Sequence, residues 1–218
     1  NNIGDAAGGL PSVAISSFGQ SAALSNDNNT VSGNNIYNYF LVAASNAVNI
    51  GSNSSAWTIS NNRFYQAAAR AGATGFQKAI AINTTSGGNY TISGNTIGYA
   101  TSAGTGTMTY SPGTAARFTA IELAVAATPV SNVQGNTVTA ISFGTTSGAS
   151  TLGAGIFHGI IVTAGGVNIG TTTGNVIGAT SGTGSITVTS TTNGGLIHGI
   201  YVSSTTGASI QNNSIGSL

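Results

Sequence analysis

Cysteine is absent from this 218-residue chain, which excludes a disulfide framework and a metal site built from thiolates. Charge is scarce too: four Lys and Arg and three Asp and Glu side chains make up 3% of the residues, against about 25% in an ordinary soluble domain. A net charge of +1 creates no field that would attract nucleic acid or an anionic membrane. No apolar run approaches the roughly 18 residues of a membrane-spanning helix. We therefore expect no nucleic-acid partner and no membrane insertion.

Glycine, by contrast, is abundant at 33 residues, and hydrophobic residues make up 40% of the chain. A polar, Gly-rich composition can indicate disorder, but Ile and Val recur here at regular intervals, which opposes it. The length suits one or two domains with a sizeable core. Because the sequence is repetitive, we expect a single elongated domain over residues 1–218.

The repeat is clearest at residues 91–98, Thr-Ile-Ser-Gly-Asn-Thr-Ile-Gly. Ile92 precedes Asn95 by three positions, and Ile97 follows it by two. Since side chains alternate along a strand, two residues five apart can both be buried only if the backbone turns between them. Gly94 readily adopts the positive φ that such a turn requires. The unit therefore predicts a strand, a left-handed corner and a second strand.

Close copies of this unit occupy residues 30–37, 58–65, 132–139, 171–178 and 209–216. The predicted corner residues, each just before the Asn, are Gly33, Asn61, Gly94, Gly135, Gly174 and Asn212. Only the copy at 171–178 lacks an aliphatic residue three positions before its Asn. We predict that the anchors form a structural ladder in which each amide bonds to the next, and they are Asn34, Asn62, Asn95, Asn136, Asn175 and Asn213. Their spacing of 28 to 41 residues is typical of a solenoid, a propeller or an array.

A second element with alternating aliphatic residues precedes each later anchor, and this pattern predicts a strand buried on one face. It occupies residues 78–82, 119–125, 158–162 and 198–202, with weaker versions at 12–16 and 39–42. The segments that vary in length follow the third strand, at 98–118, 139–156 and 178–196. We expect these Gly-, Ser- and Thr-rich insertions to form projecting hairpins on one face. One Ala-rich stretch, at 65–76, predicts a helical turn or two before Gly72.

Three strands in each repeat, a fixed Asn corner and one variable insertion point favour a right-handed parallel β-helix of about six coils. An antiparallel sandwich or barrel is the competing architecture, because it also uses short strands and Gly-rich turns.

Residues 198–218 resemble the parallel β-helix repeat of the pectate-lyase-like superfamily, in its G-I-x-V…x-I-x-x-N-x-I form. The resemblance extends from about residue 30 to residue 218 and implies the fold, while that fold carries lyases, hydrolases, adhesins and structural proteins. The nearly uncharged, Gly/Ser/Thr-rich style is similar to the large secreted repeat proteins of bacterial cell surfaces. These include autotransporter passengers and adhesins exported by the type IX route.

Polysaccharide-degrading members of this superfamily resemble one another in clustering acidic side chains, often with Ca²⁺, on one outer sheet face. The acidic residues here, Asp5, Asp27 and Glu122, lie in different repeats, so no catalytic pair of carboxylates is predicted. Glu122 is expected to point outward and to pair with Lys78 on the equivalent strand. Three further cations are candidates for the same cluster, namely Arg63, Arg70 and Arg117.

His158 and His198 occupy the same place in successive repeats, so we expect them to stack one strand apart. Two such side chains suit a metal, but the pattern offers no third ligand and no acid to orient them. We therefore predict no metal site and no cofactor. The aromatic residues are scattered, and most are expected to fill the core or the corners.

These observations favour a non-enzymatic structural or adhesive segment of a secreted or surface-anchored bacterial β-helical protein, such as a stalk, adhesin or filament. Because residues 1–4 and 213–216 both match the second half of the repeat, we interpret the chain as a piece of a longer repetitive one. Expected partners are copies or flanking repeats stacked head to tail, surface glycans and other proteins. The alternative is a carbohydrate-binding or polysaccharide-degrading β-helix whose active site lies outside this piece.

Overall fold

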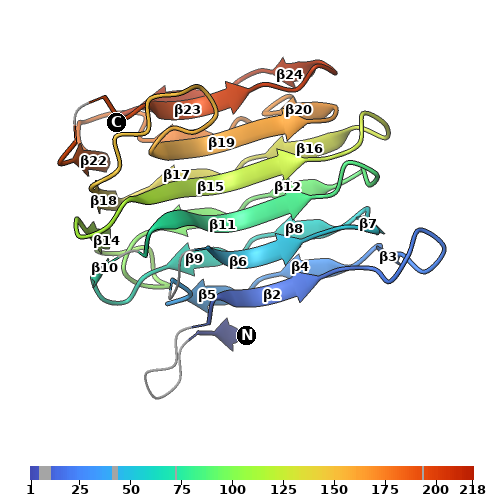
Figure 1. Cartoon of the computed structure of the whole chain (residues 1–218), viewed down its shortest axis with the longest axis horizontal. Helices are drawn as coiled ribbons and strands as arrows, with labels where there is room; N and C mark the ends of the chain where they lie inside the picture. The colour runs from blue at the N-terminus through green and yellow to red at the C-terminus, as the bar shows by residue number, and fades with distance from the viewer. Residues whose placement is uncertain (5–10, 41–43, 72, 193) are drawn as a thin grey trace.

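The chain is all-β in a computed structural model that describes residues 1–4, 11–40, 44–71, 73–192 and 194–218. These residues form 25 strands and no helix, and accordingly none of them forms a helix suited to spanning a membrane. The strands make five sheets, and every strand pair in them is parallel. Within a sheet, neighbouring strands come from successive repeats, so the repeats are stacked one above another (Figure 1). This arrangement is consistent with a β-solenoid and excludes the antiparallel sandwich.

Six long strands form the sheet that faces the viewer in Figure 1, here called the long-strand sheet. They are β2 (Val13–Ser17), β6 (Ser45–Ile50), β11 (Gly75–Asn83), β15 (Ala116–Ala124), β19 (Phe157–Ala164) and β23 (Ile197–Val202). The prediction of these strands is confirmed, except that the second lies at Ser45–Ile50 and not at 39–42. Tyr39 and Phe40 are instead buried outside any strand, and residues 41 and 42 lie outside the described part of the chain.

The strand before each Asn belongs to the pre-corner sheet, and the strand after it belongs to the post-corner sheet. The pre-corner strands are β4 (Thr30–Ser32), β8 (Thr58–Ser60), β12 (Thr91–Ser93), β16 (Ser131–Gln134), β20 (Val167–Ile169) and β24 (Ala208–Ile210). The post-corner strands are β1 (Asn2–Ile3), β5 (Asn35–Tyr37), β9 (Arg63–Tyr65), β13 (Thr96–Gly98), β17 (Thr137–Thr139), β21 (Val176–Gly178) and β25 (Ser214–Gly216).

The predicted corner is confirmed by burial on both of its sides. Ile92 and Ile97 are both fully buried, although they lie five residues apart. Gly94 between them has a φ of 64°, which residues with a side chain rarely adopt. The chain therefore folds its core residues inward from two different sheets.

The corner before Asn175 differs from the prediction. Gly174 does not adopt a positive φ, whereas Gly170 does, at 74°. The pre-corner strand β20 ends at Ile169 and pairs with its neighbours through that residue, so extra residues separate strand and Asn. This explains why the copy at 171–178 lacks the aliphatic residue.

The variable insertions do not form the predicted hairpins. They contribute β14 (Met108–Ser111), β18 (Ile141–Thr145) and β22 (Ile186–Ser190) to a parallel insertion sheet at the left of Figure 1. The fourth strand of this sheet, β10 (Arg70–Ala71), comes from the Ala-rich stretch. Met108, Tyr110 and Phe143 are buried, because alternation turns one face of these strands into the core. The helical turn predicted before Gly72 is also wrong, since Arg70 pairs with Tyr110. Gly72 itself lies outside the described residues.

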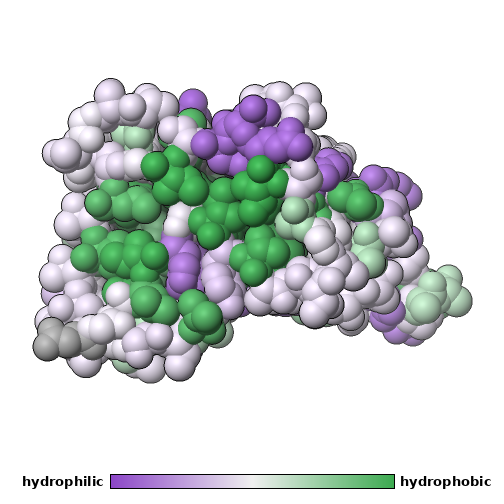
Figure 2. All heavy atoms as spheres, turned by 90° about the horizontal axis from the view of Figure 1, so that it is seen from above, coloured by the Kyte–Doolittle hydropathy of each residue, from purple (hydrophilic) through white to green (hydrophobic). Residues whose placement is uncertain are grey.

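A short fifth sheet joins β3 (Asn26–Asp27) to β7 (Ser54–Ser55) at the opposite end of the strands from the insertion sheet (Figure 1). The end of the stack that carries β23 and β24 exposes hydrophobic side chains (Figure 2). Ile197, Ile210, Ile215 and Leu218 are 43 to 49% exposed there, whereas the equivalent residues of inner repeats are buried.

Candidate functional site

The six anchor asparagines form a continuous ladder along the stack. In each step, the Nδ2 atom of one Asn donates to the Oδ1 atom of the next, at 2.8 to 3.1 Å. Asn1 extends the ladder by donating to Asn34 at 3.1 Å. The rungs are Asn34, Asn62, Asn95, Asn136, Asn175 and Asn213.

Each rung also satisfies backbone groups that the corner would leave without partners. Asn95 is typical: its Oδ1 accepts the backbone N–H of Asn62 at 3.0 Å, and its Nδ2 donates to the carbonyl of Ile59 at 2.8 Å. Asn95 is completely buried, where an unpaired polar group would cost about 1–3 kcal/mol. The ladder thus links the corner of each repeat to the corner of the next by hydrogen bonds. The amides are neutral, so they supply no general acid or base.

Three of the seven charged side chains of this chain, Lys78, Arg117 and Glu122, belong to strands of the long-strand sheet. The Nζ atom of Lys78 in β11 lies 2.7 Å from Oε2 of Glu122 in β15, which confirms the predicted ion pair. Arg117 stacks on the ring of Phe76, with its guanidinium carbon 3.7 Å from the ring centroid. Burial lowers the pKa of Arg117.

The other predicted members of that charged cluster do not join it. Arg63 begins β9 of the post-corner sheet, and Arg70 begins β10 of the insertion sheet. Asp5 lies outside the described residues. Asp27 lies in β3 and Glu122 in β15, so the two described carboxylates belong to different sheets.

The two histidines stack as predicted. The ring centroids of His158 and His198 are 5.1 Å apart, with only 7° between the ring planes, and Tyr201 lies 5.0 Å from His198. Gly155 lies close against the pair: a Cβ placed there would be 3.1 Å from Nδ1 of His198 and 3.3 Å from Nε2 of His158. This segment buries His158 completely.

Burial, and after it the nearby positive charges of His198, Arg117 and Lys78, lowers the pKa of His158 to about 4. At neutral pH the ring is therefore uncharged. Since the lone pairs of imidazole nitrogens lie in the ring plane, those of parallel rings do not converge on one ion. Within the described part of the chain, no three His, Cys, Asp or Glu side chains gather closely enough to hold a metal.

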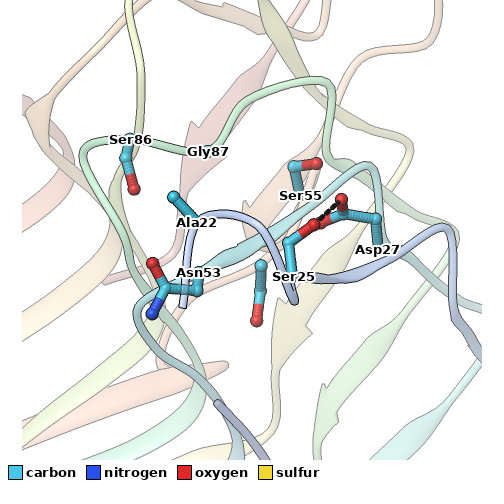
Figure 3. Close-up of a pocket in the computed structure, with 8 residues that line it drawn as sticks. Ala22, Ser25, Asp27, Asn53, Ser55, Ser86 and Gly87 are labelled. Carbon is cyan, nitrogen blue, oxygen red and sulfur yellow. Dashed lines mark hydrogen bonds between the residues drawn. The ribbon is translucent and has the colours of Figure 1, made fainter. Parts of the chain in front are cut away.

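A polar pocket of about 230 Å³ lies beside the fifth sheet (Figure 3). It is lined by Ala22, Ser25, Asp27, Asn53, Ser54, Ser55, Ser86 and Gly87. The Ser25 hydroxyl donates to Oδ2 of Asp27, and this bond, followed by bonding from Ser55, lowers the pKa of Asp27. Asp27 is therefore ionised at neutral pH. Three segments that lie far apart in the sequence meet here.

The pocket escaped prediction because each segment by itself is a short run of Ser and Asn, which is common on any surface of this chain. One signal was present: Asp27 is the only acidic residue in its repeat. Its pairing partner, Ser55, follows 28 positions later, and this distance equals the local repeat spacing. The aromatic residues mostly fill the core as expected, with Tyr39 and Tyr110 almost fully buried.

Comparison of the chain with protein-family models, with curated proteins and with solved structures finds no match.

Proposed function

We propose that the chain is a right-handed parallel β-helix of about six coils that serves as a stiff structural or adhesive segment of a secreted bacterial surface protein. Such a segment would act as a stalk, an adhesin or part of a filament. The superfamily that its repeat resembles, the pectate-lyase-like parallel β-helices, supplies the fold for this role.

The observation that carries the proposal is the unbroken Asn ladder from Asn1 to Asn213. It runs beside aliphatic columns in which Ile59, Ile92 and Val133 lie in register on neighbouring strands. Parallel strand pairing, amide bonds and apolar stacking all act along one direction. Resistance to bending therefore follows from continuous contacts between successive repeats.

Stacking of this kind can continue beyond either end. The strands at the apolar end face (Figure 2), β22, β23, β24 and β25, are edge strands of their sheets. Edge strands pair readily with further strands. Flanking repeats of the parent chain, or other copies stacked head to tail, are the partners that fit this face. Surface glycans and other proteins would bind along the sides.

The test is antibody labelling of intact source cells, with permeabilised cells as the comparison. Strong labelling of intact cells, lost after brief protease treatment of those cells, is the expected result. Labelling that requires permeabilisation would refute a surface role.

A second candidate function is carbohydrate binding or polysaccharide degradation, with any active site elsewhere in the parent chain. The polar pocket beside Asp27 (Figure 3) favours it. Incubation of the purified chain with a panel of polysaccharides tests degradation: release of oligosaccharides by the chain alone would place an active site within it.

A further inference from the structure

The polar pocket beside the fifth sheet presents several oxygen atoms that can accept hydrogen bonds. The hydroxyl hydrogen of Ser25 is committed to the carboxylate of Asp27, so the Ser25 oxygen presents lone pairs to any other partner. One N–H of the Asn53 side-chain amide donates to the carbonyl of Gly19, at 3.1 Å. Its carboxamide oxygen points into the same space as the Ser86 hydroxyl (Figure 3). A ligand that brings hydrogen-bond donors therefore fits these oxygens.

One buried polar atom of the pocket lining, Oγ of Ser54, has no hydrogen-bond partner among the described residues. Ser54 is only 2% exposed. Buried polar groups without partners are rare and call for a bound molecule or water.

The electrostatics exclude anions. Asp27 is the only charged residue in the lining, and its lowered pKa keeps it negative at neutral pH. No Lys, Arg or His pairs with it in the described part of the chain. The ligand is therefore neutral or positive.

The volume separates a neutral ligand from a metal ion. About 230 Å³ is the room of roughly seven or eight water molecules, which suits one sugar ring. Calcium would require about six to eight oxygen ligands at 2.3–2.6 Å. The lining offers one carboxylate, and its other polar side chains are Ser and Asn, so it does not resemble a calcium site.

We propose that this pocket binds one pyranose unit, whose hydroxyl groups donate to the Ser25 and Asn53 oxygens and to the carboxylate of Asp27. The inference rests on the second candidate function, carbohydrate binding, and is independent of the structural role. The sugar ring is either free or the end of a glycan.

The experiment titrates the whole chain with free hexoses, with their methyl glycosides and with calcium chloride, each followed by saturation-transfer NMR or calorimetry. One-ring ligands bind weakly, so dissociation constants of about 1–10 mM are expected. Binding of free hexoses and methyl glycosides alike indicates recognition of the ring hydroxyls. Binding of the methyl glycosides alone indicates the end of a glycan, and both outcomes support the proposal.

The variants Asp27→Asn and Ser86→Ala test the pocket, and Glu122→Gln on the long-strand sheet is the control. Asp27→Asn keeps the shape but removes a charged acceptor, so affinity should fall about tenfold or more. Ser86 lies on the exposed rim, so Ser86→Ala should leave folding intact and weaken binding about two- to fivefold. Glu122→Gln should leave binding unchanged.

Three results would overturn the inference: no sugar binds, sugar binds equally well to both pocket variants, or calcium alone binds in a way that depends on Asp27. None of these affects antibody labelling of intact cells, so failure of the pocket and failure of the surface role are distinguishable.

Discussion

Replacement of Asn95 by Ala tests the Asn ladder at its centre. The substitution removes the acceptor of the Asn62 N–H and the donor to the Ile59 carbonyl. Asn95 is 0% exposed, so both groups face a buried site and water does not replace the lost partner. At about 1–3 kcal/mol for each orphaned group, the free energy of unfolding should fall by about 2–6 kcal/mol.

The matched control is Asn213→Ala, at the last rung. The Oδ1 atom of Asn213 accepts from the backbone N–H and the Nδ2 atom of Asn175, just as Oδ1 of Asn95 accepts from those two groups of Asn62. Asn213, however, is partly exposed. Water can satisfy the groups that this change releases, so the loss should stay near or below about 1 kcal/mol. Burial of the rung, rather than the number of bonds, accounts for the difference.

Equilibrium unfolding in urea measures both losses, with far-UV circular dichroism and the fluorescence of Trp57 as probes. Trp57 is 6% exposed and therefore reports on the folded core. Coincident transitions are needed before the free energies are compared, because repeat proteins can unfold in parts. If Asn95→Ala and Asn213→Ala differ by less than about 0.5 kcal/mol, a margin set by the extrapolation, the ladder does not stabilise the corners as argued.

Asn95→Asp adds a pH arm to the same experiment. The new oxygen would face the Ile59 carbonyl, and an ionised carboxylate there would be buried without a donor. Relative to the parent chain at the same pH, the variant should therefore be less stable at pH 7 than at pH 3, where a protonated acid can donate. The ladder argument fails if its stability relative to the parent chain is independent of pH.

Three further predictions concern the long-strand sheet. His158 has a pKa of about 4 in the folded chain and about 6.5 when unfolded, so the unfolded state binds the extra proton between these values. Stability should be fully present above pH 6.5 and fall by roughly 3 kcal/mol as the pH drops to 4, and His158→Phe should remove this slope in urea unfolding. Gly159→Ala should cost about 1–3 kcal/mol by overpacking, since its Cβ would meet a carbonyl at 2.6 Å, whereas Gly113→Ala, in open space, should be neutral by thermal unfolding. Glu122→Gln removes the Lys78 ion pair and should cost about 1 kcal/mol or less; a loss that is insensitive to salt would contradict a pairing of this kind.

Local patterns predicted the repeating strands well. The odd spacing between Ile92 and Ile97 required a corner because alternation along a strand is a property of the backbone itself. The same reasoning marked Asn95 and its equivalents as rungs. It also placed His158 and His198 side by side, since equal positions in successive repeats lie on neighbouring strands.

Other features depended on how one repeat meets the next. The insertion strand at Met108–Ser111 pairs in parallel with Ile141–Thr145, and no local pattern distinguishes this pairing from a hairpin. Arg70 follows an Ala-rich stretch, yet it is extended because Tyr110 lies beside it. Pairing between strands supplies hydrogen bonds that a short isolated helical turn cannot match.

The sequence by itself determined the periodic strand, the corner and the Asn that follows it, because these depend on the two-residue alternation of a strand and on the φ values open to Gly and Asn. Only the tertiary structure decided that Gly170 rather than Gly174 makes the fifth turn, and that the insertions extend the core. It alone gathered Ser25, Asp27 and Ser86 around one pocket. The physical reason is that contacts between repeats depend on register, and register is settled only when all repeats stack together.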